Sequence, residues 1–554
     1  MKGNKNIGFT ILVYFNLFIW LIPIYYLVKL QLVKAEDYKN KISSFEKNKI
    51  IVAPRGKIYV KDKNNNLYLI ADNKKLYDIY FNPKLSKNIE KELTIISNII
   101  GEDINKQEIK GNSSFIIVKN TEKNILDKIL ALRLDSVFYE EKYIRFYPEN
   151  DFLSTILGFA KLNEDNFLVG EYGLEKYYND ILKGENGIYY GIKKIQPEIP
   201  GNDLILNIDY FIQKYSEKIL AEGIKKYKAE GGLIIVTTND GKIIALAEEP
   251  RYDLNNFNKV DDIKIFLSKA GQNYEPGSVM KTFTYFIGLD KKVFTPKDEY
   301  NDLGYLNANN WTIYNFDKKG RGKVSFEYAF EKSLNTGSAH IQRLIGNYNF
   351  LSYLKRFKFD KKPFVDFPHI YEGNIKNLEK SSKDLRDINF LTASYGHGIS
   401  LSPFHLIQAF SLIVNDGKMY NLRFLDKINY FGIKEKIIKA KILDNFGDSN
   451  SFKNIKDLLE KVTLNGSGKY ALTEGYRVGG KTGSAFIPKI NEPGYSDDII
   501  NTYLATFPLS NPQFIILVRI DKPYQGLAMV TTVPLAKKII DYLIDYYQIQ
   551  PDNL

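Results

Sequence analysis

The sequence predicts an α/β protein with a membrane-anchor helix, an extended α+β region, and a larger domain in which helices flank an antiparallel sheet. Three observations predict this fold class. Residues 7–28 carry no charge, and residues 45–200 alternate short strand-like and helical runs. Residues 201–550 have strand-like segments at both ends and helical segments between them. Strands from both ends that enclose helices imply one sheet covered by helices.

The first element is the uncharged run IGFTILVYFNLFIWLIPIYYLV at residues 7–28. As a helix it would be about 33 Å long, which spans the apolar core of a bilayer, and such a helix tolerates Asn16 and Pro23. No small-residue cleavage site follows, so we expect a retained anchor rather than a removed signal peptide. Lysines on both sides leave the orientation open. Because residues 1–6 are too few to form a domain, we expect a short cytoplasmic tail and an extracytoplasmic bulk.

The composition excludes several kinds of chemistry. The chain has no cysteine, which rules out thiol catalysis, disulfides and thiolate metal sites. Its four histidines (His340, His369, His397 and His405) show no metal-ligand spacing, so we expect no metal. The net charge of +12 is spread along the chain without a dense basic run. A lysine-biased composition accounts for it, and attraction to an anionic cell envelope is the functional alternative.

Residues 45–200 carry structural signals. Residues 114–119 (SFIIVK) are typical of a strand and residues 87–100 of a helix. We found no nucleophile, metal cluster or phosphate-binding loop in this region of the sequence. It is predicted to be a non-catalytic pedestal that holds the following domain away from the membrane.

The last part of the chain begins at Gly201, where the composition changes. Its clearest turn is Asn239-Asp240-Gly241, because Asp and Gly accept the positive backbone angles of a tight hairpin. A closing amphipathic helix is predicted over residues 534–547. The predicted strands are residues 203–209, 232–238, 242–247, 502–507 and 514–520. The first of these leads into a helix through Gln213 and Ile224.

The candidate nucleophile lies in the run YEPGSVMK at residues 274–281. Pro276 and Gly277 end the preceding segment, and Ser278 then falls on the first turn of a helix. Ser278 and Lys281 share one face of that helix, so the lysine amine can take the proton of the hydroxyl. The helix would bury Phe283, Tyr285, Phe286 and Ile287.

Two further motifs strengthen the assignment of Ser278 and Lys281 as a catalytic pair. The Ser-x-x-Lys spacing alone is weak evidence, because Ser44 with Lys47 and Ser352 with Lys355 have it too. Downstream, however, the chain carries Ser333-Leu334-Asn335 and then Lys481-Thr482-Gly483-Ser484. Ser-x-x-Lys, Ser-x-Asn and Lys-Thr-Gly in this order are typical of penicillin-binding proteins and serine β-lactamases.

Over nearly its whole length the sequence resembles the class B penicillin-binding proteins, which are monofunctional peptidoglycan D,D-transpeptidases. In the pedestal the resemblance rests on Arg55–Ile58 and Gly173–Lys176, and at the start of the transpeptidase domain on Leu206–Asp209 with Gln213. Three further stretches resemble the septal, cell-division branch more than the elongation branch: residues 275–278, 396–403 and 481–485. The resemblance implies a dimerisation-type pedestal at 45–200 and a transpeptidase domain at 201–550.

The resemblance also implies a role for each motif residue. A D-alanyl-D-alanine stem peptide acylates Ser278, D-alanine leaves, and an amine of a neighbouring stem attacks the ester. Lys281 is the base and must be neutral, Ser333 passes a proton towards the leaving amine, and Asn335 positions Lys281 and the substrate amide. No cofactor is implied.

The third motif is expected to bind the terminal carboxylate of the substrate through Lys481, Thr482 and the hydroxyl of Ser484. The family usually has threonine where this chain has Ser484, but the hydroxyl is retained. Gly483 would let the substrate backbone approach the strand edge. The backbone N–H groups of Ser278 and Ser484 would form the oxyanion hole.

The implied partners are peptidoglycan stem peptides, β-lactam antibiotics, a membrane glycan polymerase and division proteins, with no nucleic acid. The implied location is the bacterial inner membrane, crossed once, with the catalytic domain outside the cytoplasm.

Some motif residues also have structural interpretations. Ser333 and Asn335 could cap a helix, and Lys481–Gly483 could be a strand end with its turn. His397 lies between two glycines and has no acidic partner at a recognisable spacing in the sequence. We therefore interpret it as part of a loop with unusual backbone geometry rather than as a base.

Other classes of protein share part of the pattern. A serine β-lactamase must activate a water, and its Glu-x-x-Leu-Asn string occurs here only at Glu331–Asn335, whose asparagine the second motif already uses. A β-lactam sensor would need a cytoplasmic domain, and a bifunctional glycosyltransferase would need a second catalytic domain before residue 230. A catalytically inactive division scaffold is the non-enzyme alternative, against which the presence of all the motif residues argues.

Overall fold

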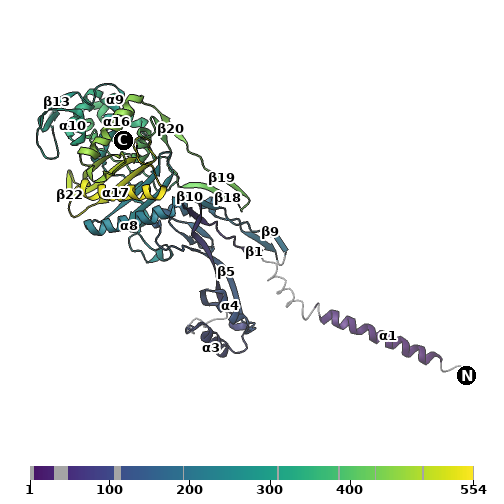
Figure 1. Ribbon diagram of the computed structural model, residues 1–554. Helices are drawn as coiled ribbons and strands as arrows, with labels where there is room; N and C mark the ends of the chain where they lie inside the picture. Colours follow the sequence, from purple (N-terminus) through teal and green to yellow (C-terminus); the bar gives the residue numbers. More distant parts are fainter. Residues whose placement is uncertain are drawn as a thin grey trace. The chain divides into compact units, whose positions relative to one another are not determined.

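The computed structural model describes residues 5–29, 31, 48–104, 114–190, 193–308, 311–384, 387–430, 432–489 and 492–552 (Figure 1). The chain forms two compact units: residues 1–54 with 184–201, and residues 55–183 with 202–554. Most of the predicted pedestal therefore belongs to the same unit as the predicted transpeptidase domain.

The first unit contains α1 (Lys5–Val28) and a three-stranded antiparallel sheet of β1 (Asn48–Ile51), β8 (Gly187–Tyr190) and β9 (Lys193–Gln196). Across the described part of the chain, no helix is both long enough and apolar enough to cross a membrane. The anchor predicted at residues 7–28 coincides with α1 and stays a prediction. Residues 1–4 of the predicted tail, and Ser44 with Lys47, lie outside the described residues.

A seven-stranded sheet joins the two sides of the predicted domain boundary. Its order is β19-β18-β10-β2-β3-β4, and β5 also pairs with β3. β10 pairs in parallel with β2, so this strand does not belong to the catalytic sheet that follows it in sequence. The strands are β2 (Ile58–Lys61), β3 (Leu67–Phe81), β4 (Phe115–Thr121), β5 (Val137–Phe146), β10 (Asp203–Asp209), β18 (Leu425–Tyr430) and β19 (Lys434–Ile437).

The far end of β3, β4 and β5 has its own small core. Ile79 and Phe81 of β3 pack with α3 (Ile89–Ile100) and α4 (Lys123–Leu130), and Figure 1 shows both helices at the end of these strands. The strand predicted at residues 114–119 corresponds to β4, and the helix predicted at residues 87–100 corresponds to α3.

Nearer the catalytic part, three charged side chains are buried together. Arg55 Nε lies 2.7 Å from Glu175 Oε2, and Arg145 Nε lies 2.6 Å from Glu175 Oε1. Burial raises the pKa of Glu175, but the charges of Arg145 and Arg55 outweigh burial and hold that pKa below its usual value. The two pedestal landmarks of the sequence, around Arg55 and Glu175, are thus in direct contact.

The catalytic sheet has five strands in the order β12-β11-β23-β22-β21, and all neighbours are antiparallel. The hairpin prediction is confirmed, because β11 and β12 are consecutive and Gly241 has φ +88°. The strands are β11 (Gly231–Thr238), β12 (Ile243–Glu249), β21 (Gly479–Pro488), β22 (Tyr495–Phe507) and β23 (Phe514–Asp521).

Helices cover both faces of this sheet, as the alternation along β11 shows. Ile234 and Val236 pack against α8 (Tyr210–Tyr227) and α17 (Ala528–Tyr547), which lie side by side in Figure 1. Leu233 and Ile235 point to the other core, which contains α9 (Met280–Asp290), α15 (Pro403–Val414) and α16 (Ser449–Asn465). The predicted sheet covered by helices is therefore confirmed.

The closing helix starts earlier than predicted. The helix was predicted over residues 534–547, whereas α17 begins at Ala528 and contains Pro534, a residue that is unusual inside a helix.

The other elements of the second unit are short. Paired strands form four ribbons: β6 (Ala160–Leu162) with β7 (Leu168–Gly170), β13 (Glu299–Asp302) with β16 (Gly322–Ser325), β14 (Tyr305–Ala308) with β15 (Trp311–Tyr314), and β17 (Lys418–Tyr420) with β20 (Ile442–Asn445). The remaining α-helices are α5 (Ser154–Leu157), α6 (Gly173–Tyr177), α7 (Asn179–Leu182), α10 (Phe326–Glu331), α11 (Asn335–Ile345), α12 (Asn347–Arg356), α13 (Lys376–Asp384) and α14 (Asp387–Ala393). The 3₁₀ helices are η2 (Pro83–Leu85), η4 (Leu254–Lys259), η5 (Ile263–Phe266), η6 (Lys269–Gly271), η7 (Gly277–Val279) and η8 (Lys469–Ala471).

Candidate active site

Ser278 lies on η7, which runs directly into α9, so Lys281 follows it by about one helical turn. Gly277 has φ +54°, and a Cβ added there would lie 3.2 Å from Ala485 Cβ on β21. The turn that carries the serine is therefore packed tightly against the catalytic sheet. Ser278 is partly exposed in a cavity, whereas Lys281 is fully buried.

The amine of Lys281 is held by the second motif. Its Nζ donates to the Ser333 carbonyl at 2.6 Å and to Asn335 Oδ1 at 2.8 Å, and it lies 3.3 Å from Ser333 Oγ. Burial, with a smaller contribution from the charge of Lys481, lowers the pKa of Lys281 well below that of an ordinary lysine. These conditions favour the neutral amine that a general base requires.

Ser333 connects two lysines. Lys481 Nζ donates to Ser333 Oγ at 2.9 Å, so this hydroxyl lies between the amines of Lys281 and Lys481. Ser333 follows the end of α10 and has φ +59°, a left-handed conformation that few residues other than glycine adopt. Strained backbone of this kind is frequent in active sites.

Asn335 is the first residue of α11. Its Oδ1 accepts from Lys281, and its Nδ2 donates to the Tyr314 carbonyl at 2.9 Å. The residue that caps α11 is Leu334, which makes no side-chain capping bond. The alternative in which Ser333 and Asn335 merely cap a helix is therefore wrong.

The third motif lies on β21. Lys481 is fully buried, and burial lowers its pKa to about 7. The hydroxyl of Ser484 donates to Asn501 Oδ1 at 2.7 Å and accepts from the N–H of Ala528 at 3.1 Å. A Cβ on Gly483 would lie 2.7 Å from the Pro276 carbonyl oxygen. The missing side chain of Gly483 therefore makes room for the nucleophile turn, which is a different reason from the substrate approach expected from the sequence.

These residues surround a cavity of about 430 Å³. Ser278, Ser333, Asn335, Thr482 and Ser484 line it. Lys281 and Lys481 are fully buried beside it and reach it through the hydroxyl of Ser333. None of the described residues that line it carries a carboxylate.

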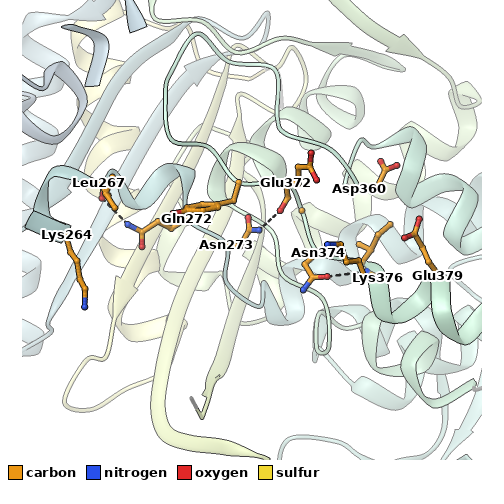
Figure 2. Close-up of a pocket in the computed structure, with 12 residues that line it drawn as sticks. Lys264, Leu267, Gln272, Asn273, Asp360, Glu372, Asn374, Lys376 and Glu379 are labelled. Atoms are coloured by element: carbon orange, nitrogen blue, oxygen red, sulfur yellow. Dashed lines mark hydrogen bonds between the residues drawn. The ribbon is translucent and has the colours of Figure 1, made fainter. Parts of the chain in front are cut away.

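A larger cavity of about 740 Å³ lies beside the segment that precedes the nucleophile turn (Figure 2). Its charged lining mixes Lys264 and Lys376 with Asp360 and Glu372, and Asn273 Nδ2 donates to the Glu372 carbonyl at 2.6 Å (Figure 2). No serine or threonine is among its described lining residues. The smaller cavity, which contains the nucleophile and its base, is therefore the candidate active site.

Comparisons with known proteins agree with this geometry. Residues 231–541 match the family model described as the penicillin binding protein transpeptidase domain. The chain belongs to this family. Residues 50–199 of this penicillin-binding protein also match the penicillin-binding protein dimerisation domain.

Its relatives extend over most of the chain. It is 28% identical over 509 residues to stage V sporulation protein D of Bacillus subtilis, a match that covers 87% of this chain and 76% of that protein. It is 27% identical over 489 residues to peptidoglycan D,D-transpeptidase FtsI of Buchnera aphidicola, covering 83% of this chain and 80% of that protein. Penicillin binding protein 2X of Streptococcus thermophilus shares the fold, with a TM-score of 0.77 at 19% identity over 90% of this chain and 81% of that one. The resemblance to class B penicillin-binding proteins is confirmed, and the protein is a transpeptidase.

Sequence reasoning missed several residues of the site of this transpeptidase. Phe316, Tyr395, Ser467, Phe486 and Met529 line the cavity, and none of them is part of a motif that we recognised. His397 also lines the cavity, although the sequence analysis assigned it to loop geometry. Asn501 orients Ser484 from the facing position on β22, which only the strand register could have revealed.

Proposed function

We propose that Ser278 carries the D,D-transpeptidase reaction of this protein, in which stem peptides of peptidoglycan are cross-linked through an acyl-enzyme. The observation that carries this proposal is the position of the Lys281 amine. It is fully buried beside the Ser278 cavity and bonded to both residues of the second motif.

In the acylation step, neutral Lys281 removes the proton of Ser278, and Oγ attacks the carbonyl carbon of the penultimate D-alanine. The carbon–nitrogen bond to the terminal D-alanine breaks, and its nitrogen receives a proton from Lys281 through the hydroxyl of Ser333. The hydrogen bonds of Ser333 with Lys281 and Lys481 support this path. The backbone N–H groups of Ser278 and Ser484 stabilise the oxyanion, and a donor of this kind contributes about 3 kcal/mol.

The terminal carboxylate of the substrate would meet Thr482, Ser484 and the start of α17. Thr482, Ser484 and residues 527–530 line the same cavity, and the positive end of a helix dipole favours an anion. Lys481 is fully buried and bonds to Ser333 Oγ and the Thr482 carbonyl. Lys481 therefore attracts the carboxylate through its charge rather than through a direct contact. The negative charge of the bound carboxylate in turn raises the pKa of Lys481.

The lining also argues against a β-lactamase. Rapid hydrolysis of the acyl-enzyme requires a base for water, and no carboxylate lines the described cavity. Glu331 instead pairs with Lys332 at 2.7 Å. A scaffold without activity would have no need of a buried lysine amine, since burying such a polar group away from water is costly.

The test is the intact mass of the protein after mixing with a penicillin, followed over time. We expect a one-to-one adduct that persists for many minutes, is absent in Ser278→Ala, and is retained in Ser352→Ala and Ser44→Ala. An adduct that forms and disappears quickly would identify a β-lactamase. No adduct in the wild type would favour the inactive scaffold, and an adduct on Ser352 or Ser44 would overturn the site assignment.

We also propose a septal role, single-pass anchoring through residues 7–28 with the catalytic domain extracytoplasmic, a pedestal at 45–200, and contacts with a membrane glycan polymerase. The sequence of the anchor and the FtsI name of several relatives support these points.

A fluorescent fusion of the protein should concentrate at the division site, and labelling of the side wall would favour the elongation branch. Co-purification of the full chain with a glycan polymerase, lost when residues 1–200 are deleted, would support the contact.

A further inference from the structure

Part of the wall of the catalytic cavity takes no part in the acylation chemistry. Tyr395 and His397 line the cavity and belong to the loop that follows α14. Neither residue contacts Lys281 or Ser333 through a hydrogen bond in the described structure.

This loop is fixed to the nucleophile turn. Gly396 and Gly398, on either side of His397, have φ +87° and +73°. A Cβ on Gly396 would lie 2.2 Å from the Gly277 carbonyl oxygen, and the Gly277 N–H donates to the Gly396 carbonyl at 3.3 Å. The position of His397 is therefore set relative to Ser278, which follows Gly277 directly.

The ring of His397 is also held from its sides. Its centroid lies 5.3 Å from that of Tyr395 and 5.6 Å from that of Tyr495. The hydroxyl of Tyr495 donates to Glu275 at 3.1 Å, and Glu275 also accepts from the N–H of Gly398 at 2.9 Å. A buried carboxylate three residues before the nucleophile thus holds both the loop and one of the rings that flank His397.

In spite of this order, the polar atoms of the pair have no partner. Across the described residues, neither the Tyr395 hydroxyl nor the His397 ring makes a hydrogen bond, although Tyr395 is only 7% exposed. His405 is different, because its Nδ1 lies 2.7 Å from Ser402 Oγ and its Nε2 lies 2.7 Å from the Lys361 carbonyl oxygen. Because both residues line the cavity and His397 is only partly buried, these polar atoms are available to a ligand bound there.

We propose that Tyr395 and His397 form the subsite for the acceptor stem peptide, with His397 accepting an N–H of the attacking amine. The proposal rests on the transpeptidase function above. It concerns the second half of the reaction, after D-alanine has left and the donor peptide is esterified to Ser278.

The acceptor enters as a neutral amine with two N–H groups and one lone pair. One N–H is bound by His397, and the lone pair attacks the ester carbon. The carbon–nitrogen bond forms, the bond from carbon to Ser278 Oγ breaks, and the second amine proton passes through Lys281 to Oγ. Tyr395 donates its hydroxyl proton to a carbonyl or carboxylate oxygen of the acceptor.

The electrostatic state of the ring agrees with this role. Burial, and then the charge of Lys281, lower the pKa of His397 to about 4. The imidazole is therefore neutral near pH 7 and can accept an N–H, whereas an imidazolium would repel an incoming amine that still carried its proton.

The experiment measures how the acyl-enzyme is partitioned. The full chain reacts with a thioester analogue of the donor peptide in the presence of D-methionine as the acceptor, and the transferred and hydrolysed products are counted. The concentration of working sites is set by labelled penicillin, which also shows that each variant is folded. We expect the ratio of transfer to hydrolysis to fall about tenfold in His397→Ala and several-fold in Tyr395→Phe, as for the loss of one hydrogen bond to a bound ligand.

Two variants serve as controls. His397→Gln keeps a hydrogen-bond acceptor and should recover most of the ratio. His369→Ala removes a histidine that is exposed and lies against Tyr172 outside the cavity, and should leave the ratio unchanged. An unchanged ratio in His397→Ala would overturn the proposal, as would acylation by penicillin that fell by the same factor as transfer. A wild type that is not acylated at all would instead contradict the proposed function.

Discussion

Lys481 Nζ lies 2.9 Å from the hydroxyl of Ser333, which places a strand lysine in contact with a residue 148 positions earlier in the chain. The same hydroxyl is 3.3 Å from Lys281 Nζ. The three motifs of the sequence therefore meet at one oxygen atom, and the protonation states of the two lysines are coupled through it and through their charges.

This coupling predicts the pH dependence of acylation. Lys281 must be neutral, and its pKa lies well below the ordinary lysine value, so activity should rise with pH as it loses its proton. Lys481 must be charged, and its pKa of about 7 predicts a fall in activity as pH rises through that value. We expect a bell-shaped profile of the second-order rate constant for labelled penicillin, with its alkaline limb near pH 7 in the free enzyme.

The control for this profile is Lys481→Arg. A guanidinium stays charged across the whole range, so whatever activity remains should lose its alkaline limb. A flat profile in the wild type, or an alkaline limb that persists in the arginine variant, would show that another group is responsible.

Ser333 makes it possible to separate strain from chemistry. Its φ of +59° suits glycine better than any residue with a Cβ. Ser333→Gly and Ser333→Ala both remove the hydroxyl, so we expect both to slow acylation by about 10²–10³-fold. Ser333→Gly should be the more stable of the two by about 1 kcal/mol, as measured by thermal denaturation. An alanine variant as stable as the glycine variant would mean that the left-handed backbone is not strained.

The buried Arg55–Glu175–Arg145 cluster predicts a large effect on stability. Glu175→Ala would leave two buried guanidinium groups without their carboxylate. Such a loss typically lowers the free energy of unfolding by about 3–5 kcal/mol. The matched control is Lys74→Met, which breaks the exposed pair with Glu122 and should change stability by less than about 1 kcal/mol. Chemical denaturation of both variants checks the difference, and similar losses in the two would contradict it.

Much of the site could be predicted because its chemistry is local in sequence. The spacing of Ser278 and Lys281 and the order of the three motifs follow from short stretches, and strand-like segments at both ends of residues 201–550 predict a sheet covered by helices. The parts that were missed depend on contacts between distant segments. The packing of Gly483 against Pro276 and the bond from Ser484 to Asn501 appear only once the sheet register is known.

The place of His397 on the cavity wall could not be predicted for a similar reason. Glycines on both sides of it indicate an unusual backbone, which the structure has. The direction of the side chain, however, is set by Gly277, Tyr395 and Tyr495, which lie far from it or carry no motif. The strand at residues 203–209 was predicted, but its parallel pairing with β2 was not, because the sequence does not show which distant strand becomes a parallel partner.

Asn335 provides a direct test of the base. Its Oδ1 accepts from Lys281 Nζ at 2.8 Å, so Asn335→Asp would place a negative charge beside that amine with little change in shape. An adjacent opposite charge stabilises the ammonium form and typically raises a lysine pKa by about 1 unit or more. We expect the acid limb of the acylation profile to move to higher pH by about that amount, and the rate near neutral pH to fall.

Asn335→Ala should lower the rate without this shift, because it removes the hydrogen bond to Lys281 without adding a charge. Asn64→Asp, an exposed change in the pedestal, should leave both the rate and the profile as they are. Labelled-penicillin kinetics over the pH range distinguish the three variants. If the acid limb of Asn335→Asp stayed in place, Lys281 would not be the group whose deprotonation controls acylation, since no other amine accepts or donates a bond to Asn335 within the described structure.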